Sequence, residues 1–132
     1  MKNVRDEMKT HESQEMYLET ILLLRAKRSS VRSVDIVEER GYAKSSVSRA
    51  VNLLLRDGLI NIDPSGEITL TPKGQNRAET VYEKHRVFTE VFMQMGADRE
   101  LAEDNACRVE HVISDDLFEI LKKFLETQND PR

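Results

Sequence analysis

The sequence predicts a mainly α-helical protein in which one short β-hairpin separates an N-terminal group of helices from a C-terminal group. Its 132 residues are 39% hydrophobic and 33% charged, with five Gly and three Pro, a composition typical of a helix-rich globular domain. Apolar residues recur three or four positions apart along most of the chain, which places them on one face of a helix. Between two short apolar segments, Asp63-Pro64-Ser65-Gly66 suits a type I turn and predicts the hairpin.

The first expected helix spans residues 13–27. Tyr17, Ile21 and Leu24 fall on one face of it, while Glu15 and Arg25 are polar. The first dozen residues and the last six are the soft segments of the chain, and we expect both to fray.

Two further helices are expected around a tight turn. The first has Ser33 as its N-terminal cap and ends at Gly41, which can adopt the left-handed conformation. The second begins at Ser45 or Ser46 and ends at Gly58. Its apolar residues fall at helical spacing: Val47, Ala50, Val51, Leu54 and Leu55. Two short helices joined by a four-residue turn are typical of a helix-turn-helix.

The strands of the hairpin are expected at residues 59–62 and 68–70. A hairpin that directly follows a helix-turn-helix lies where the wing of a winged helix-turn-helix belongs. We therefore predict an N-terminal winged helix-turn-helix domain over residues 1–73, followed by a helical domain over residues 74–132.

The second domain is expected to contain three helices. Thr71 caps the first, which has Pro72 at its first helical position and is ended by Gly96. Asp98 caps the next, which runs to about residue 113, and Ser114 caps the last, which runs to about residue 127.

The last helix carries one apolar stripe, formed by Leu117, Ile120, Leu121, Phe124 and Leu125. Together with Phe88, Phe92 and Met95, this stripe forms a larger hydrophobic surface than a domain of this size exposes to water. This predicts a homodimer and a dimerisation role for the second domain. The alternative is that the stripe is ordinary core.

Charge is distributed unevenly along the chain, although its net value is only −4. Residues 25–56 contain eight basic and three acidic side chains, whereas residues 77–132 contain eight basic and thirteen acidic ones. Only the first segment is suited to contact phosphate. We therefore expect double-stranded operator DNA as a partner of the first domain.

The predicted recognition helix starts with small polar and basic residues, as base-edge contacts require, while its other face is apolar. Arg49 is the best candidate for a bidentate contact to guanine, and Arg32 and Arg56 are expected to contact phosphates near helix ends. The predicted DNA-binding residues are Arg32, Lys44, Ser45, Ser46, Ser48, Arg49 and Arg56. The alternative is that the serines are helix caps and the basic residues a solvated face.

Three metal-binding residue types lie within one helical turn of the second domain. Cys107, Glu110 and His111 stand at i, i+3 and i+4, which places a thiolate, a carboxylate and an imidazole on one face, and Glu103 shares that face. The trio suggests a metal site. The alternative is a cysteine that fills space in the core beside an exposed Glu-His pair.

Four segments resemble the diphtheria toxin repressor family of metal-dependent regulators. They are Glu15-Met16-Tyr17-Leu18, Ser45-Ser46-Val47, Lys84-His85-Arg86, and the run from Ala106 to Asp115 around Cys107. The similarity spans about residues 14–124. It implies a winged helix-turn-helix domain joined to a helical dimerisation domain, with Fe²⁺ or Mn²⁺ as corepressor.

The resemblance also implies a set of metal ligands. Carried over position by position, it makes Met16, Cys107, Glu110 and His111 ligands, and it places His85 in an adjacent site. Met16 and Cys107 match the iron-type branch, whereas Glu19 resembles a ligand of the manganese-type branch. Thioether and thiolate donors favour a softer metal than manganese, which favours iron and leaves both ions open.

The remaining features exclude several classes of protein. No apolar stretch near the start is long enough for a membrane span or a signal peptide, and a single cysteine fits a reducing compartment, so we expect a cytoplasmic protein without a membrane partner. We expect a transcriptional repressor and no enzyme. A metallohydrolase with Glu110 as general base is the remote alternative, and a winged-helix regulator that senses an organic ligand, or redox state through Cys107, is the closer one.

Overall fold

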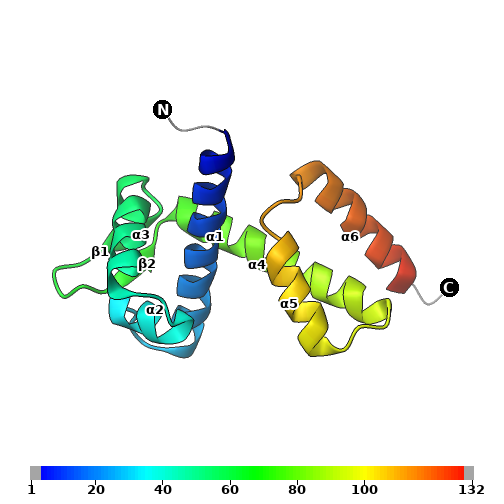
Figure 1. The fold of residues 1–132 in the computed structure, drawn as a ribbon, viewed down its shortest axis with the longest axis horizontal. Helices are drawn as coiled ribbons and strands as arrows, with labels where there is room; N and C mark the ends of the chain where they lie inside the picture. Colours follow the sequence, from blue (N-terminus) through cyan, green and yellow to red (C-terminus); the bar gives the residue numbers. More distant parts are fainter. Residues whose placement is uncertain (1–3, 130–132) are drawn as a thin grey trace. The chain divides into compact units, whose positions relative to one another are not determined.

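The computed structural model describes residues 4–129, and over these residues the fold is mainly helical, as predicted. The chain divides into two compact units, residues 1–79 and 80–132 (Figure 1). Among the described helices, none combines the length and apolar content needed to cross a bilayer. In chain order the elements are α1 (Val4–Lys27), α2 (Ser33–Arg40), α3 (Lys44–Arg56), β1 (Ile60–Ile62), β2 (Ile68–Leu70), α4 (Pro72–Gln94), α5 (Arg99–Val109) and α6 (Asp115–Asn129).

The first unit packs α1, α2, α3 and the hairpin around one apolar core. Leu18 and Ile21 of α1 are fully buried there, as are Leu54 of α3 and Ile68 of β2. The helical period predicted for α1 is confirmed, but the helix begins at Val4, nine residues before the predicted start. The added residues contain no Gly or Pro to interrupt a helix, so the backbone hydrogen bonds continue toward the N-terminus.

The helix-turn-helix is present, but its caps differ from the predicted ones. Ser33 is the first residue of α2, and the Asp35 carboxylate accepts a hydrogen bond from the Arg32 N–H at 2.8 Å. Gly41 ends α2 in the left-handed conformation (φ 70°), as predicted. The third helix begins at Lys44 after Ala43, so neither predicted serine caps it.

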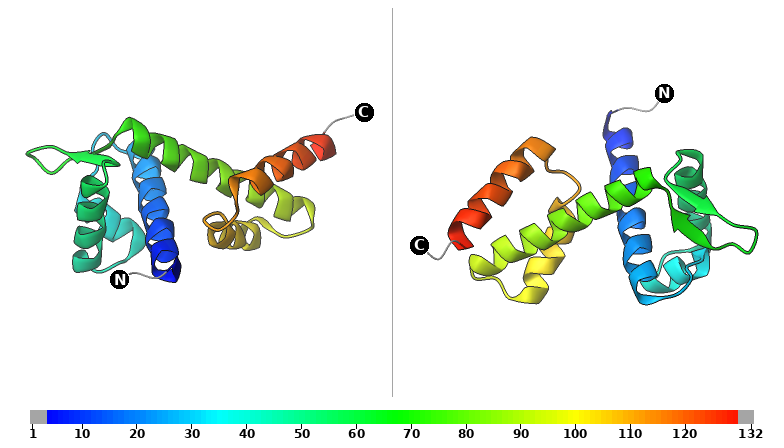
Figure 2. Two further views of the ribbon diagram at one scale, coloured as in Figure 1. Left: turned by 90° about the horizontal axis from the view of Figure 1, so that it is seen from above. Right: turned by 180° about the vertical axis from the view of Figure 1, so that it is seen from behind.

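The hairpin follows α3 and projects from the first unit as the wing (Figure 2). Its strands are antiparallel, with Ile60 opposite Leu70 and Ile62 opposite Ile68. The predicted turn is confirmed by the Gly66 N–H, which donates to the Asp63 carbonyl at 2.9 Å. The hairpin therefore stands directly behind the helix-turn-helix in the chain, as a wing does.

The helix α4 begins in the first unit and continues into the second. Its predicted cap is confirmed, because the Thr71 hydroxyl accepts a hydrogen bond from the Gly74 N–H at 3.1 Å. Gly74 lies against the backbone of Leu59, and a Cβ atom on it would overlap the Leu59 carbonyl. The start of α4 is thus packed directly on the segment that leads into β1.

The second unit contains the C-terminal half of α4 together with α5 and α6. Both predicted caps are confirmed: Asp98 accepts from the Leu101 N–H at 2.8 Å, and the Ser114 hydroxyl accepts from the Leu117 N–H at 3.2 Å. The fifth helix ends at Val109, four residues before the predicted end.

Of the eight apolar residues predicted to form a surface on the second unit, four are exposed and three are half-buried. On α6, Leu117, Ile120 and Phe124 are 54%, 64% and 56% exposed, and Met95 at the end of α4 is 77% exposed. Phe88 is an error in the predicted set, because it is buried and its ring centroid lies 6.4 Å from that of Phe118. The stripe on α6 is therefore not core within one chain.

Candidate functional site

The recognition helix α3 separates polar and apolar residues as predicted. Val47, Val51 and Leu54 are buried, while the polar residues near its start are exposed: Lys44, Ser45, Ser46, Ser48 and Arg49. Leu55 was expected to be buried but is 43% exposed, because it lies on the edge of the apolar face near the helix end. The exposed start of α3 thus presents hydrogen-bonding and cationic groups.

Arg32 connects the start of α2 with the tip of the wing. Its guanidinium donates from Nε to the Ser65 carbonyl at 3.1 Å and from Nη2 to the Ser65 hydroxyl at 3.3 Å. Asp63, in the same turn, accepts hydrogen bonds from the Ser65 N–H and hydroxyl, and these lower the pKa of its carboxyl group. The exposed Arg32 therefore belongs to a network that fixes the wing.

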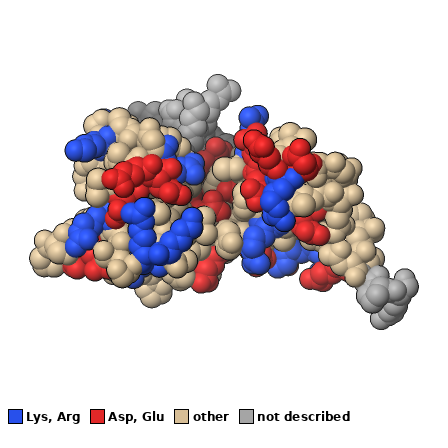
Figure 3. All heavy atoms as spheres, turned by 90° about the horizontal axis from the view of Figure 1, so that it is seen from below, with Lys and Arg blue, Asp and Glu red and all other residues tan. Residues whose placement is uncertain are grey.

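Other basic residues of the first unit are paired with carboxylates. Arg56 donates to Asp57 at 3.0 Å; this hydrogen bond raises the pKa of the guanidinium and lowers that of the carboxyl group. Arg28 similarly donates to Asp35 at 2.7 Å. Basic and acidic side chains consequently lie side by side on the first unit, at the left of Figure 3. Such pairing limits the attraction for phosphate that the sequence count alone suggests.

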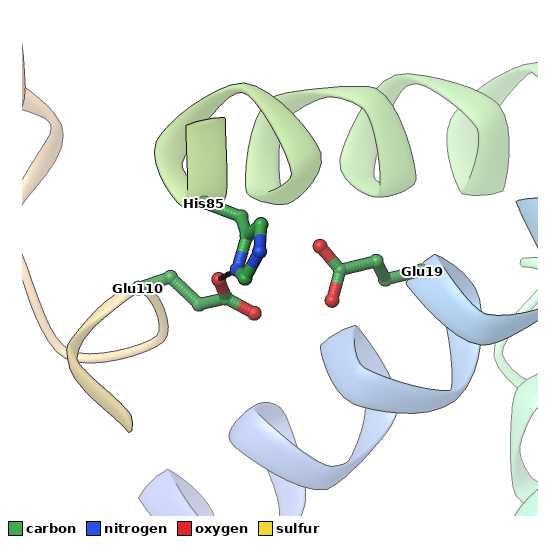
Figure 4. Close-up of side chains that lie close together, drawn as sticks. All are labelled: Glu19, His85 and Glu110. Carbon is green, nitrogen blue, oxygen red and sulfur yellow. Dashed lines mark hydrogen bonds and ion pairs between the residues drawn. The ribbon is translucent and has the colours of Figure 1, made fainter. Parts of the chain in front are cut away.

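Glu110 is the most deeply buried ionisable residue of the predicted metal-binding set. It follows α5 directly, its side chain is fully buried, and its Oε2 lies 2.7 Å from His85 Nδ1 on α4 (Figure 4). Its Oε1 lies 3.3 Å from Nε2 of His111. A buried carboxylate between two imidazoles is an arrangement that proteins use for proton or cation binding, because burial of an ionised carboxylate is costly without such partners.

Cys107, Glu110 and His111 keep the predicted helical spacing, although α5 ends at Val109. The Glu110 N–H donates to the Ala106 carbonyl at 3.0 Å, and the Glu110 backbone is still right-handed helical (φ −62°, ψ −22°). Cys107, half-buried, therefore remains one turn before Glu110 and His111. Glu103, one turn earlier, is exposed and lies 3.4 Å from Arg99.

The other two predicted ligands, Met16 and Glu19, lie on α1 in the first unit. Both are half-buried and, three residues apart, they share a face of the helix. The Met16 Sδ accepts a hydrogen bond from the Tyr42 hydroxyl at 3.2 Å. Figure 4 also draws Glu19, which projects from α1. Sequence reasoning missed Tyr42, since no spacing rule connects a turn residue with a helix 26 positions earlier.

The chemistry of these side chains fits a divalent transition metal. They offer two imidazoles, two carboxylates, one thiolate and one thioether: His85, His111, Glu19, Glu110, Cys107 and Met16. Imidazole and carboxylate bind iron and manganese, and the sulfur donors add preference for a softer ion than calcium or magnesium. The buried Glu110 carboxylate, with an imidazole nitrogen on each oxygen, is the part of this set that a cation would stabilise most.

The chain belongs to the family of iron-dependent repressors. Residues 9–67 match the family's N-terminal DNA-binding domain, and residues 71–132 match its metal-binding and dimerisation domain. The exposed recognition helix and the buried carboxylate described above lie in these two regions respectively. The resemblance seen in the sequence is thereby confirmed, as is the predicted combination of a DNA-binding domain with a helical dimerisation domain.

Individual relatives support this membership. An uncharacterised HTH-type transcriptional regulator of Methanocaldococcus jannaschii is 31% identical over 90% of this chain and 97% of its own length. The diphtheria toxin repressor of Corynebacterium glutamicum is 34% identical over 85% of this chain and 50% of its own. The solved manganese regulator SloR has 31% identity and a TM-score of 0.77, covering 86% of this chain and 53% of that one. The chain thus spans about half the length of the latter two proteins.

Proposed function

We propose that this protein is a transcriptional repressor that binds operator DNA as a homodimer when Fe²⁺ or Mn²⁺ is bound, and that it has no catalytic activity. The observation that carries the proposal is the buried Glu110 carboxylate between His85 and His111, in a chain whose other unit exposes a polar recognition helix. The proposed metal ligands are Met16, Glu19, His85, Cys107, Glu110 and His111. We take residues 1–73 as the DNA-binding domain, called the reading head below, and residues 74–132 as the metal-binding domain.

In this proposal the reading head contacts DNA through α3 and the wing. Arg49 reads a base edge, most suitably guanine, and the serines and Lys44 at the start of α3 contact neighbouring bases and phosphates. Arg32 and Arg56 contact phosphates from the ends of α2 and α3. Both have carboxylate or hydroxyl partners nearby, so their role is orientation and affinity rather than sequence choice.

Metal controls DNA binding by selecting one conformation of the chain. The proposed ligands come from α1, which packs against the recognition helix in the core of the first unit, and from α4 and the end of α5. A ligand that binds only one arrangement stabilises it by RT ln(1 + [L]/Kd), about 2.7 kcal/mol at one hundred times Kd. That is enough to make a minor conformation the major one, without contact between metal and DNA.

The donor set supports iron more than manganese. Met16 and Cys107 supply sulfur, which softer ions prefer, whereas Glu19 and Glu110 supply the oxygens that manganese prefers. Copper, nickel, cobalt and zinc also bind such donors strongly, so the concentration of each ion in the cell decides which one acts. A comparison of Fe²⁺ with Mn²⁺ in the DNA-binding assay below is therefore part of the test.

Fluorescence anisotropy with a labelled operator fragment tests the proposed function. Affinity should fall on addition of a chelator and return when Fe²⁺ is added under anaerobic conditions, or when Mn²⁺ is added. Arg49→Ala should abolish sequence-specific binding while metal binding, measured by equilibrium dialysis, stays unchanged. DNA affinity that does not respond to metal would overturn the proposal.

Equilibrium dialysis also separates the proposal from the closer alternative. A regulator that senses an organic ligand, or redox state through Cys107, would bind no stoichiometric metal. In that case DNA binding would not respond to a chelator, and Cys107→Ser would remove its response to an oxidant. Stoichiometric metal together with chelator-sensitive DNA binding excludes this alternative.

A further inference from the structure

Tyr42 lies at a functional junction of the first unit. It follows Gly41 in the turn between α2 and α3, and only Ala43 separates it from the start of the recognition helix. Its hydroxyl donates a hydrogen bond to the Met16 sulfur on α1, across 3.2 Å. One hydrogen bond thus connects a proposed metal ligand with the turn of the helix-turn-helix.

Neighbouring side chains fix the position of the Tyr42 ring. The Arg40 guanidinium lies 5.6 Å from its centroid and donates to its hydroxyl at 3.3 Å, a cation–π contact reinforced by a hydrogen bond. The ring of the buried Tyr17 also lies close, with its centroid 6.1 Å from that of Tyr42 and an interplanar angle of 60°. The hydroxyl therefore points at the Met16 sulfur from a ring held by three contacts.

We infer that Tyr42 is a positioning residue whose hydroxyl restrains the Met16 thioether and thereby lowers the affinity of the protein for its metal. The inference rests on the proposed function, because it takes Met16 as a ligand. It adds a residue of the reading head that sets the metal concentration at which the protein responds. For this effect, Tyr42 needs only its hydrogen bond with Met16.

The direction of the effect follows from the chemistry of sulfur. A thioether is a weak acceptor, and the electron density that it gives to the Tyr42 O–H is the density that a metal ion withdraws. Metal coordination by Met16 and donation from Tyr42 therefore oppose each other. By thermodynamic linkage the effect is reciprocal: if metal binding weakens the hydrogen bond, the hydrogen bond lowers the affinity for metal by the same factor.

The same linkage reaches the recognition helix. When Met16 binds metal, the weakened bond with Tyr42 releases a restraint on the turn directly before α3. The shift in the environment of this tyrosine is observable, because the chain has no Trp and only three Tyr, namely Tyr17, Tyr42 and Tyr82. Metal binding should therefore change the ultraviolet difference spectrum of tyrosine.

Isothermal titration of Fe²⁺ under anaerobic conditions tests the inference in a double-mutant cycle of Tyr42→Phe and Met16→Leu. Tyr42→Phe keeps the ring and its contacts but removes the donor, and it should bind metal about two- to tenfold more tightly, the range that net hydrogen-bond energies represent. Met16→Leu should bind metal more weakly. In the Met16→Leu background, Tyr42→Phe should have no further effect, because the acceptor is gone.

Tyr82→Phe is the matched control. Tyr82 lies on α4 in the second unit, and its ring likewise carries a guanidinium, that of Arg86 at 5.2 Å. Its removal should leave metal affinity unchanged. The metal-induced tyrosine difference spectrum should shrink in Tyr42→Phe and persist in Tyr82→Phe, which a purely structural effect on stability would not produce.

The outcomes separate this inference from the proposed function. Unchanged or weaker metal affinity in Tyr42→Phe, while Met16→Leu still weakens binding, would overturn the role of Tyr42 and leave the metal-dependent repressor intact. An effect of Tyr42→Phe that persists in the Met16→Leu background would also overturn it. If Met16→Leu leaves metal affinity unchanged, Met16 is not a ligand and the inference falls together with that assignment.

Discussion

At the scale of single residues, the sequence showed which donors are present but not which of them meet. The i, i+3, i+4 spacing of Cys107, Glu110 and His111 is local, and a helix fixes it. The contact between Glu110 and His85 joins positions 25 residues apart, and only the packing of α4 beside the end of α5 creates it. The full burial of Glu110 was likewise invisible in a segment that reads as polar.

Glu110→Gln tests the importance of that buried carboxylate. The amide keeps the size of the side chain and can still accept from His85, so the fold should persist. Metal binding should weaken at least tenfold, because even residues that only orient ligands account for tenfold to a hundredfold changes in affinity. Calorimetric titration with Mn²⁺ measures the loss.

Glu103→Gln is the control for this substitution. Glu103 lies on α5, about two turns before Glu110, and the substitution removes the same charge, but the Glu103 side chain is exposed and pairs with Arg99. Its metal affinity should match that of the wild type. Equal losses in both variants would mean that general electrostatic attraction, and not coordination by Glu110, holds the ion.

Asp63 gives a pH-dependent prediction at the tip of the wing. Hydrogen bonds from Ser65 and from the Glu67 N–H lower the pKa of this carboxyl group, so the ionised form stabilises the folded turn. The stabilisation is present above the unfolded pKa of about 3.9 and is lost as the pH falls through the lower folded value. Acidification below about pH 4 should therefore reduce hydrogen-exchange protection of the Ser65 and Glu67 amides.

Asp63→Asn separates this effect from the geometry of the turn. The asparagine side chain keeps an acceptor oxygen for the same amides but cannot ionise. Its protection factors should be lower than those of the wild type at neutral pH and should not change on acidification. An identical pH dependence in both proteins would assign the effect to another group.

At the scale of helices and strands, prediction succeeded where a single residue determines the backbone. Gly41 and the Asp98 cap were placed correctly, because a left-handed residue and an N-cap carboxylate act within one turn. Ser33 and Ser45 were predicted as N-terminal residues one and two positions too late, because the N-caps are Arg32, whose N–H donates to Asp35, and Ala43. Boundaries thus failed where several adjacent residues compete for the same position.

Gly74→Ala addresses the packing between α4 and the wing. Alanine is normally the better helix former, so sequence rules predict stabilisation. In the structure, the added Cβ would overlap the Leu59 carbonyl, which also accepts the Thr71 N–H at 3.1 Å. Because overpacking is destabilising, we expect the free energy of unfolding to fall by about 2–3 kcal/mol. Urea titrations followed by circular dichroism measure this change.

Gln75→Ala, one position later and half-buried, provides the comparison. It gains a little helix propensity, less than Gly74→Ala, and loses a hydrogen bond to Glu79, so its stability should stay within about 0.5 kcal/mol of the wild type. A Gly74→Ala protein as stable as this control would show that the start of α4 can move away from Leu59 at little cost.

At the scale of the whole molecule, composition and periodicity were sufficient for the class of fold and for two kinds of domain. They were also sufficient for the exposed stripe on α6, because its apolar residues share one helical face. They were not sufficient for contacts such as Met16 with Tyr42, which arise only when α1 packs beside the helix-turn-helix. The residue types therefore indicated the proposed function, whereas the hydrogen bond between Tyr42 and Met16 is visible only in the structure.

The exposed stripe leads to a prediction about assembly. Ile120 is 64% exposed and lies between Leu117 and Phe124, so a lysine there would put a charge into the centre of the proposed dimer interface. Ile120→Lys should sediment as a monomer at micromolar concentration, where the wild type sediments as a dimer. Its operator affinity should fall by at least a hundredfold, because one reading head then contacts only one half-site of a two-fold operator. Glu126→Gln, exposed on the opposite face of α6, changes the charge by the same amount and should remain dimeric. Dimers of Ile120→Lys would place the interface elsewhere, and a monomeric wild type that still binds operator cooperatively would show that DNA, and not this stripe, brings two copies together.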